Sequence, residues 1–316
     1  CLFLSFIYTF AISETNGSSG LQSDNKLHND NNTLFIVHGI VCSNLPINST
    51  SIYIMHNVEL IGDDLKIPNN HIFNKKNINI EKEVETDKII GIPKENIITL
   101  QVFTYKCKDY GKEVLPYHYI MEPPNSSLFM PWATDILPHE ISDNIDNLRT
   151  NKYNLISNFI GMPLEHNVKL NDSLKKYNIK YKNYGGTFNI KSDNNKSIEE
   201  NMALIQESII APALQSEWQI ENGYIPCRIF KNISYGKMGI TNNLELQNLF
   251  QDKLIYSDDI NTLVNKSLIF SASNKYYSVV EELMIEVKEK HTYINRINFI
   301  LDYLDKYFQI TLLTKK

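Results

Sequence analysis

The sequence predicts an α/β protein with two domains, and three observations carry this prediction. In the C-terminal half, short apolar runs typical of buried strands alternate with longer runs of helical periodicity. A chain of 316 residues also has room for two domains of ordinary size. Finally, the composition changes sharply after Pro123, where proline, asparagine and serine break any regular element. We therefore expect the domain boundary within residues 125–150.

The bulk composition excludes some classes of protein. Hydrophobic residues make up 42% of the chain and charged residues 21%, as in globular domains. The net charge of -5 argues against a nucleic-acid partner, because such proteins usually carry a basic excess. The four cysteines form no C-x-x-C pair and have no histidine cluster beside them, which argues against a zinc site. Free thiols are favoured over a disulfide between Cys42 and Cys107.

Residues 1–32 are predicted to lie outside both domains. The apolar run at residues 2–12 is too short to span a bilayer. It fits the end of a signal segment or a core strand of a fold whose beginning is missing, so we expect the chain to be a fragment. Residues 13–32 are polar and rich in glycine, serine and asparagine, which predicts a flexible linker. The sequence is compatible with a cytoplasmic protein and with a membrane-associated one.

Residues 33–130 are predicted to form an N-terminal domain with a sheet. Apolar or alternating runs predict strands at residues 34–41, 52–55, 97–105 and 117–121. His38 and His56 stand near the ends of the first two strands. Histidine is a usual choice for a general base, so both are candidate catalytic residues.

From residue 151 onward, strands and helices alternate. The predicted strands are residues 155–160, 179–181, 209–214, 238–241 and 254–256. The predicted helices are residues 164–177, a helix that begins at the capping box of Ser197 and Glu200, and residues 226–236, 244–250, 260–268, 276–290 and 292–308. Such alternation implies a parallel sheet, whose ligands bind at the carboxyl ends of the strands.

The most informative stretch is residues 224–243, YIPCRIFKNISYGKMGITNN. Pro226 stands where a first helical turn tolerates proline, and Gly236 stands where a left-handed C-terminal cap is expected. One face of the helix carries Arg228, Lys231, Asn232 and Tyr235. Basic side chains near a helix N-terminus suit an anion, most naturally a phosphate or diphosphate. The alternative interpretation is an ordinary solvated helix face.

The order of these elements resembles the donor-binding domain of nucleotide-sugar glycosyltransferases of the GT-B fold, in particular the bacterial family 1/4-like group. In that family a proline, a basic residue and the tail small-x-Gly-x-x-x-x-Thr form the sugar-nucleotide pocket. The matching residues here are Pro226, Arg228, Ser234, Gly236 and Thr241. Further similarity lies in residues 208–215, 254–264 and 291–297. The chain departs from the family at Lys231, where many members carry a glutamate that binds ribose.

The resemblance implies two Rossmann-like domains facing a cleft, the first of them incomplete. Residues 33–130 would form the acceptor-side domain, 131–150 the interdomain segment, 151–290 the nucleotide-sugar-binding domain and 291–316 a C-terminal helix. The implied activity is that of a hexosyltransferase, which moves a sugar from a nucleotide sugar to a glycan or lipid-linked acceptor. A peripheral association with a membrane is compatible with this activity. No cofactor is expected. The sequence contains no D-x-D motif, which favours transfer without a metal.

The resemblance also implies a set of site residues. The donor would be bound by Gly185, Gly186, Ser208, Gln215, Pro226, Arg228, Lys231, Asn232, Thr241 and Asn242. Arg228 and Lys231 would neutralise the leaving diphosphate. Asp135 is a third candidate catalytic residue, which would bind sugar or acceptor at the cleft.

Two alternatives stay open at this point. A non-catalytic protein that binds nucleotide sugars or glycans is favoured by Lys231, which stands in place of an acid. A GT-B-like sugar-nucleotide epimerase would have the same architecture and act without an acceptor. An NAD-dependent enzyme is disfavoured, because no G-x-G-x-x-G follows a predicted strand.

Overall fold

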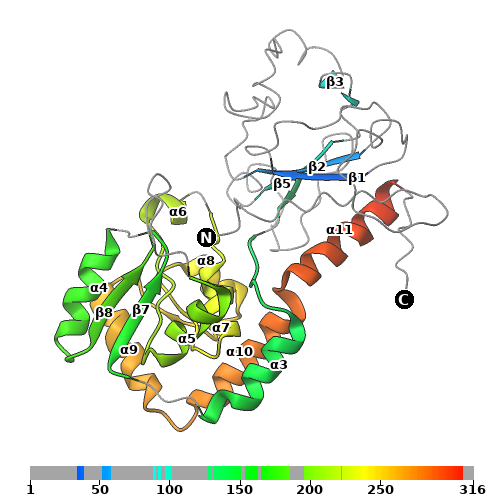
Figure 1. The fold of residues 1–316 in the computed structure, drawn as a ribbon. Coiled ribbons are helices and arrows are strands. Elements are labelled where there is room, and N and C mark those ends of the chain that lie inside the picture. The colour runs from blue at the N-terminus through cyan, green and yellow to red at the C-terminus, as the bar shows by residue number, and fades with distance from the viewer. Residues whose placement is uncertain are drawn as a thin grey trace. The chain divides into compact units, whose positions relative to one another are not determined.

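The computed structural model describes residues 131–150, 154–162, 165–185, 196–221 and 223–308, together with the strands of the N-terminal part (Figure 1). The chain divides into two compact units, Phe3–Met130 and Pro131–Lys316. The division falls inside the region where the composition changes.

The N-terminal unit contains a parallel sheet of four strands in the order β1-β2-β5-β6. Its strands are β1 (Leu34–His38), β2 (Ile52–Asn57), β5 (Ile97–Gln101) and β6 (Ser127–Phe129). A short antiparallel pair is formed by β3 (Lys88–Ile89) and β4 (Ile92–Pro93). His38 and His56 are partners in the register of β1 and β2. The strand predicted at residues 117–121 lies outside the described residues.

The C-terminal unit is built on a second set of parallel strands. They are β7 (Ile156–Ile160), β8 (Lys180–Tyr184), β9 (Ile240–Thr241) and β10 (Ile255–Tyr256). β7 pairs with β8 and β9 with β10, in both cases parallel. Between β7 and β9 runs an extended stretch, residues 208–215, which we call the central segment. Its amide groups bridge its neighbours: Ile209 N donates to Ile156 O at 2.9 Å and Ala213 N to Ile240 O at 2.8 Å.

These hydrogen bonds give the layer the spatial order β8, β7, central segment, β9, β10. In chain order these are the second, first, third, fourth and fifth strands. The first and third strands are therefore neighbours in the middle of the layer. The mixed α/β class that the sequence predicts is confirmed, with small parallel sheets.

Helices follow most of these strands. They are α3 (Pro138–Asn147), α4 (His166–Lys175), α5 (Ile198–Glu207), α6 (Glu217–Glu221), α7 (Arg228–Ser234), α8 (Leu244–Leu249), α9 (Ile260–Ser271), α10 (Tyr276–Lys290) and α11 (Tyr293–Phe308), with a 3-10 turn at Leu148–Thr150. The predicted capping box is present at α5, where Ser197 Oγ accepts from Glu200 N and Glu200 Oε2 accepts from Ser197 N at 2.7 Å. α4 packs against α9, and α3 and α7 pack against α10. Within the described residues, none of these helices is both long and apolar enough to cross a membrane.

The predicted helix at residues 226–236 is shorter in the structure. It starts at Arg228, because the first ladder bond runs from Lys231 N to Cys227 O, and Pro226 lies in the turn before it. Its end agrees with the prediction. Gly236 has φ +91°, Gly236 N donates to Ile233 O at 2.9 Å and Lys237 N donates to Asn232 O at 3.0 Å. These two bonds form a Schellman cap, which a glycine with positive φ permits.

The first residues of the C-terminal unit, 131–135, form an extended segment that we call the strap. It is held in place by Arg296 of α11 and by His291, which lies just before α11. The Arg296 guanidinium donates to Pro131 O at 3.1 Å and to Trp132 O at 3.3 Å, and Thr134 N donates to His291 O at 3.0 Å. His291 is stacked on the Phe230 ring at 4.8 Å between centroids. Burial, with Arg296 nearby, holds the pKa of the His291 imidazole well below its ordinary value, so the ring is neutral.

Lys237 leads to a prediction about stability. It is 1% exposed, and its Nζ donates to Ser208 O at 2.5 Å. Burial lowers its pKa to about 7. In the unfolded chain a lysine has a pKa of about 10.4. Between about pH 7 and 10 the unfolded chain therefore binds more protons than the folded chain. Stability should therefore rise with pH over this window.

We expect Lys237→Met to stabilise the protein at pH 7 by a few kcal/mol and to remove this rise. Urea unfolding at about pH 7 and about pH 9.5 gives the change in unfolding free energy with pH for each protein. Subtracting one change from the other cancels the titration of all other groups. Equal dependence on pH in the two proteins would contradict the expectation.

Candidate functional site

The candidate site lies at the carboxyl ends of β7 and the central segment. Because these are the first and third strands of the layer, the connections leave them in opposite directions along the sheet. Open α/β sheets bind ligands at such a reversal. Two residues at these strand ends are therefore candidates for ligand contact. They are Gly161 after β7 and Gln215 at the end of the central segment.

The Arg228 guanidinium links these two strand ends. Its Nε donates to Ile160 O at 3.0 Å and its Nη1 to Leu214 O at 2.8 Å. The guanidinium carbon lies 4.1 Å from the centre of the Phe159 ring, a cation–π contact. α7 thus sets a rigid positive charge on the last carbonyls of both central strands.

This charge has no acidic counterpart in the described part of the chain, where no carboxylate forms an ion pair with Arg228. Arg228 is also partly exposed. Burial lowers the pKa of the guanidinium from its ordinary value, but an arginine in a protein stays protonated. Two of its N–H groups bind the strand ends, and others remain for a ligand. The arrangement suits an anion.

Glycine is required where the chain passes this guanidinium. Gly161 has φ +141°, and a Cβ built there would lie 2.3 Å from Arg228 Nη2. Gly185, at the end of β8, packs so closely that a Cβ would lie 2.1 Å from Gly161 O. The structure therefore places Gly185 against Gly161, where its role is close packing of the backbone. Gly186 lies outside the described residues.

Three of the predicted donor-binding residues form one hydrogen-bond network at the same edge. Gln215 N donates to Asn242 Oδ1 and Asn242 Nδ2 donates to Gln215 O, both at 2.9 Å. Asn243 Nδ2 donates to Gln215 Oε1 at 2.9 Å, and Thr241 Oγ1 accepts from Asn243 N. All four side chains are buried. Their amide groups are used in joining the central segment to β9, so they shape the edge.

Lys231 stands in a different environment from Arg228. Its Nζ lies 2.6 Å from Asp135 Oδ2, and the Tyr235 hydroxyl donates to Asp135 Oδ1 at 2.6 Å. The Asp135 side chain is 4% exposed. Burial and the adjacent carboxylate raise the pKa of the Tyr235 phenol, which stays a donor. The charge of Lys231 is therefore neutralised within the strap, and Asp135 anchors residues 131–135 to α7.

Other predicted residues lie away from this edge. Ser208 is at the opposite, amino end of the central segment, where its Oγ donates to Leu204 O and accepts from Asn158 N. Asn232 donates to Ala211 O at 2.8 Å in the middle of that segment, and Pro226 is buried before α7. The structure does not bring these three side chains to the site. His38 and His56 belong to the other unit.

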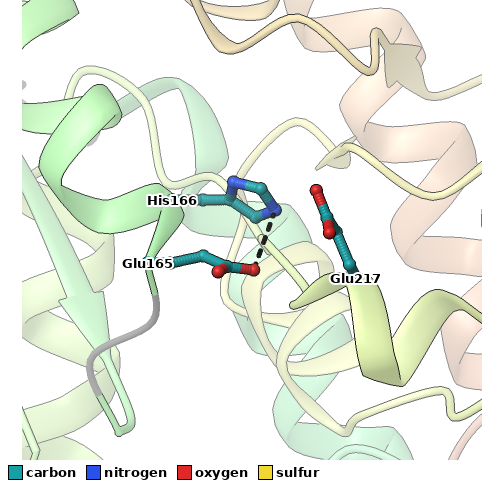
Figure 2. A group of neighbouring side chains, drawn as sticks. All are labelled: Glu165, His166 and Glu217. Carbon is teal, nitrogen blue, oxygen red and sulfur yellow. Dashed lines mark ion pairs between the residues drawn. The ribbon is translucent and has the colours of Figure 1, made fainter.

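Sequence reasoning missed one cluster, formed by Glu165, His166 and Glu217 (Figure 2). Glu165 and His166 begin α4, which follows β7, and Glu217 begins α6, which follows the central segment. The sequence carries no signal for it, because the two parts come from separate connections and form no local motif. Only the strand order brings them to the same edge.

The chain was compared with protein-family models, with curated proteins and with solved structures, and none of them matches it.

Proposed function

We propose that the C-terminal unit binds the diphosphate of a nucleotide sugar at the edge marked by Arg228, and that the chain is a glycosyltransferase of the GT-B type, with two Rossmann-like domains. The observation that carries this proposal is the guanidinium of Arg228, which is fixed by Ile160 O and Leu214 O and has no acidic partner in the described part. It lies where sheets of this strand order bind ligands.

The chemistry fits such a group. When a glycosidic bond to a diphosphate breaks, negative charge grows on the leaving group. Because two carbonyls already orient the guanidinium, it needs no rearrangement to stabilise that charge. Gly161 has no side chain, and Arg228 Nη2 fills the space that a Cβ would take, so the guanidinium lies directly against the backbone after β7. The network of Gln215 and Asn242 holds the next strand end in place.

The N-terminal unit would bind the acceptor. Its parallel sheet sets His38 and His56 at the same level of adjacent strands, near their carboxyl ends. A general base for an acceptor hydroxyl is expected from this pair. This assignment follows from the register of the strands and from the resemblance.

A nucleotide-sugar-binding protein without transferase activity is the second candidate, and one observation favours it. Lys231 stands at the position where many of the glycosyltransferases that the sequence resembles carry a ribose-binding glutamate, and it is held by Asp135 of the strap. The chain therefore supplies no acid for the ribose at this position. A binding protein needs only the diphosphate contact.

The two candidates are separated in two steps. Isothermal titration of the full chain with UDP, GDP, UMP and GMP tests the site, and we expect the diphosphates to bind tighter than the monophosphates. Release of nucleotide from UDP- and GDP-sugars, with and without glycan acceptors, then tests turnover. Binding without acceptor-dependent release favours the binding protein, and sugar conversion without acceptor favours an epimerase. Absence of any diphosphate binding would contradict both proposals.

A further inference from the structure

A group of metal-ligating side chains stands at the same edge of the sheet and takes no part in the contacts of Arg228. It consists of Glu165, His166 and Glu217, which we call the carboxylate–histidine cluster (Figure 2). Each residue offers one ligand atom, and the three atoms all lie within 4.8 Å of one another. His166 Nε2 is 3.9 Å from Glu165 Oε1. Figure 2 shows Glu217 reaching toward the imidazole from the opposite side.

The orientation of the imidazole fits an ion bound at its Nε2. His166 is 9% exposed, and no hydrogen bond to either ring nitrogen is formed within the described residues. Its Nδ1 is fully enclosed, whereas its Nε2 faces the two carboxylates. Nδ1 is therefore the enclosed nitrogen, and an ion in the cluster would not pair it. Nε2 is the nitrogen that can bind an ion, because it faces the two carboxylates and forms no hydrogen bond within the described residues.

The charges point the same way. In the described part of the chain, neither carboxylate of the cluster forms an ion pair with a lysine or arginine. Both glutamates are exposed, so their side chains can move. Ligand atoms bound to one ion at about 2.0 to 2.2 Å lie roughly 3 to 4 Å apart, which is a small adjustment from the observed arrangement.

We propose that Glu165, His166 and Glu217 bind one divalent transition-metal ion. One imidazole nitrogen with two carboxylate oxygens is a donor set for Mn²⁺ or Zn²⁺, whereas Ca²⁺ and Mg²⁺ prefer oxygen alone. Three protein ligands leave coordination positions open for water or an oxygen of a bound molecule. The site does not depend on the proposed transferase function, because protein groups alone hold the ion. It also departs from the metal-free chemistry that the missing D-x-D motif suggests.

The test uses Mn²⁺ as the probe and the full chain, freed of metal by a chelator and without nucleotide. We expect isothermal titration to show one Mn²⁺ bound per chain, and Zn²⁺ to displace it more readily than Mg²⁺ does. Glu217→Gln should weaken Mn²⁺ binding by about tenfold or more, since it removes a charged ligand. Glu221→Gln, a matched change at an exposed position on the same helix, should leave binding unchanged.

His166→Ala should also abolish Mn²⁺ binding. If this variant fails to fold, as circular dichroism would show, the exposed Glu217 carries the test alone. Binding that does not saturate, or equal Mn²⁺ affinity in Glu217→Gln and Glu221→Gln, would overturn the proposal. Preference for Mg²⁺ over Zn²⁺ would overturn the role of the imidazole. None of these results depends on UDP or GDP, so failure of the metal site and failure of the nucleotide site are distinguishable.

Discussion

Arg228→Ala is expected to weaken the binding of UDP or GDP by about a hundredfold or more, and to reduce turnover of the matching nucleotide sugar at least as much. The variant loses charge-assisted hydrogen bonds to the diphosphate, each of which contributes about 1.5 to 3 kcal/mol. Nucleoside monophosphates should lose less, because they make fewer such contacts. Isothermal titration with the four nucleotides gives both numbers.

The fold must be followed in the same variant, because Arg228 also ties the ends of β7 and the central segment. Arg149→Ala removes an arginine whose side chain is 67% exposed and serves as the matched control. Arg228→Lys should be intermediate, since a lysine keeps the charge but cannot reproduce the planar fork. A folded Arg228→Ala variant with unchanged diphosphate affinity would refute the assignment.

Gly161→Ala tests the same geometry from the opposite direction. Its Cβ would collide with Arg228 Nη2 and would force an alanine into a backbone region that it rarely adopts. We expect diphosphate binding to fall although the guanidinium is retained. Val168→Ala, at an exposed position on α4, should have no effect on binding. Wild-type affinity in Gly161→Ala would mean that the ligand lies elsewhere.

The sequence predicts those parts of this site whose residues contact neighbours close to them in the chain. The end of α7 was predictable, because a glycine with positive φ and its two cap bonds lie within a few residues. Periodicity placed Arg228 and Lys231 on one face of α7, but it could not tell their environments apart. The partner of Lys231 is Asp135, 96 residues earlier in the chain, and no local pattern reports such a contact.

The strand order has the same limitation. Apolar runs identified β7, β8 and the central segment, yet their neighbours follow from hydrogen bonds such as Ile209 N to Ile156 O. From the sequence alone, Ser208 and Gln215 are equally suited to a ligand, although in the structure they stand at opposite ends of the segment. The carboxylate–histidine cluster is hidden for the same reason, since it forms only when the first and third strands become neighbours.

Asp135→Ala should be the most destabilising change in the strap. It removes the carboxylate that binds both Lys231 Nζ and the Tyr235 hydroxyl, and with it the negative charge 2.6 Å from a largely buried ammonium. Removing one partner of a buried ion pair costs about 3 to 5 kcal/mol. Urea unfolding of the full chain measures the loss, and Asp146→Ala, an exposed aspartate on α3, is the control.

The double variant Asp135→Ala/Lys231→Met separates the charge from the loss of packing. If the cost of Asp135→Ala comes from losing the negative charge beside the Lys231 ammonium, removing that ammonium as well should recover a large part of the stability, whereas the costs of two independent packing defects would add. The same proteins decide between a structural and a catalytic aspartate. A strap anchor predicts that Asp135→Ala, where folded, still binds UDP or GDP through Arg228, with a lower unfolding free energy. Wild-type stability combined with lost turnover would instead assign Asp135 to the chemistry.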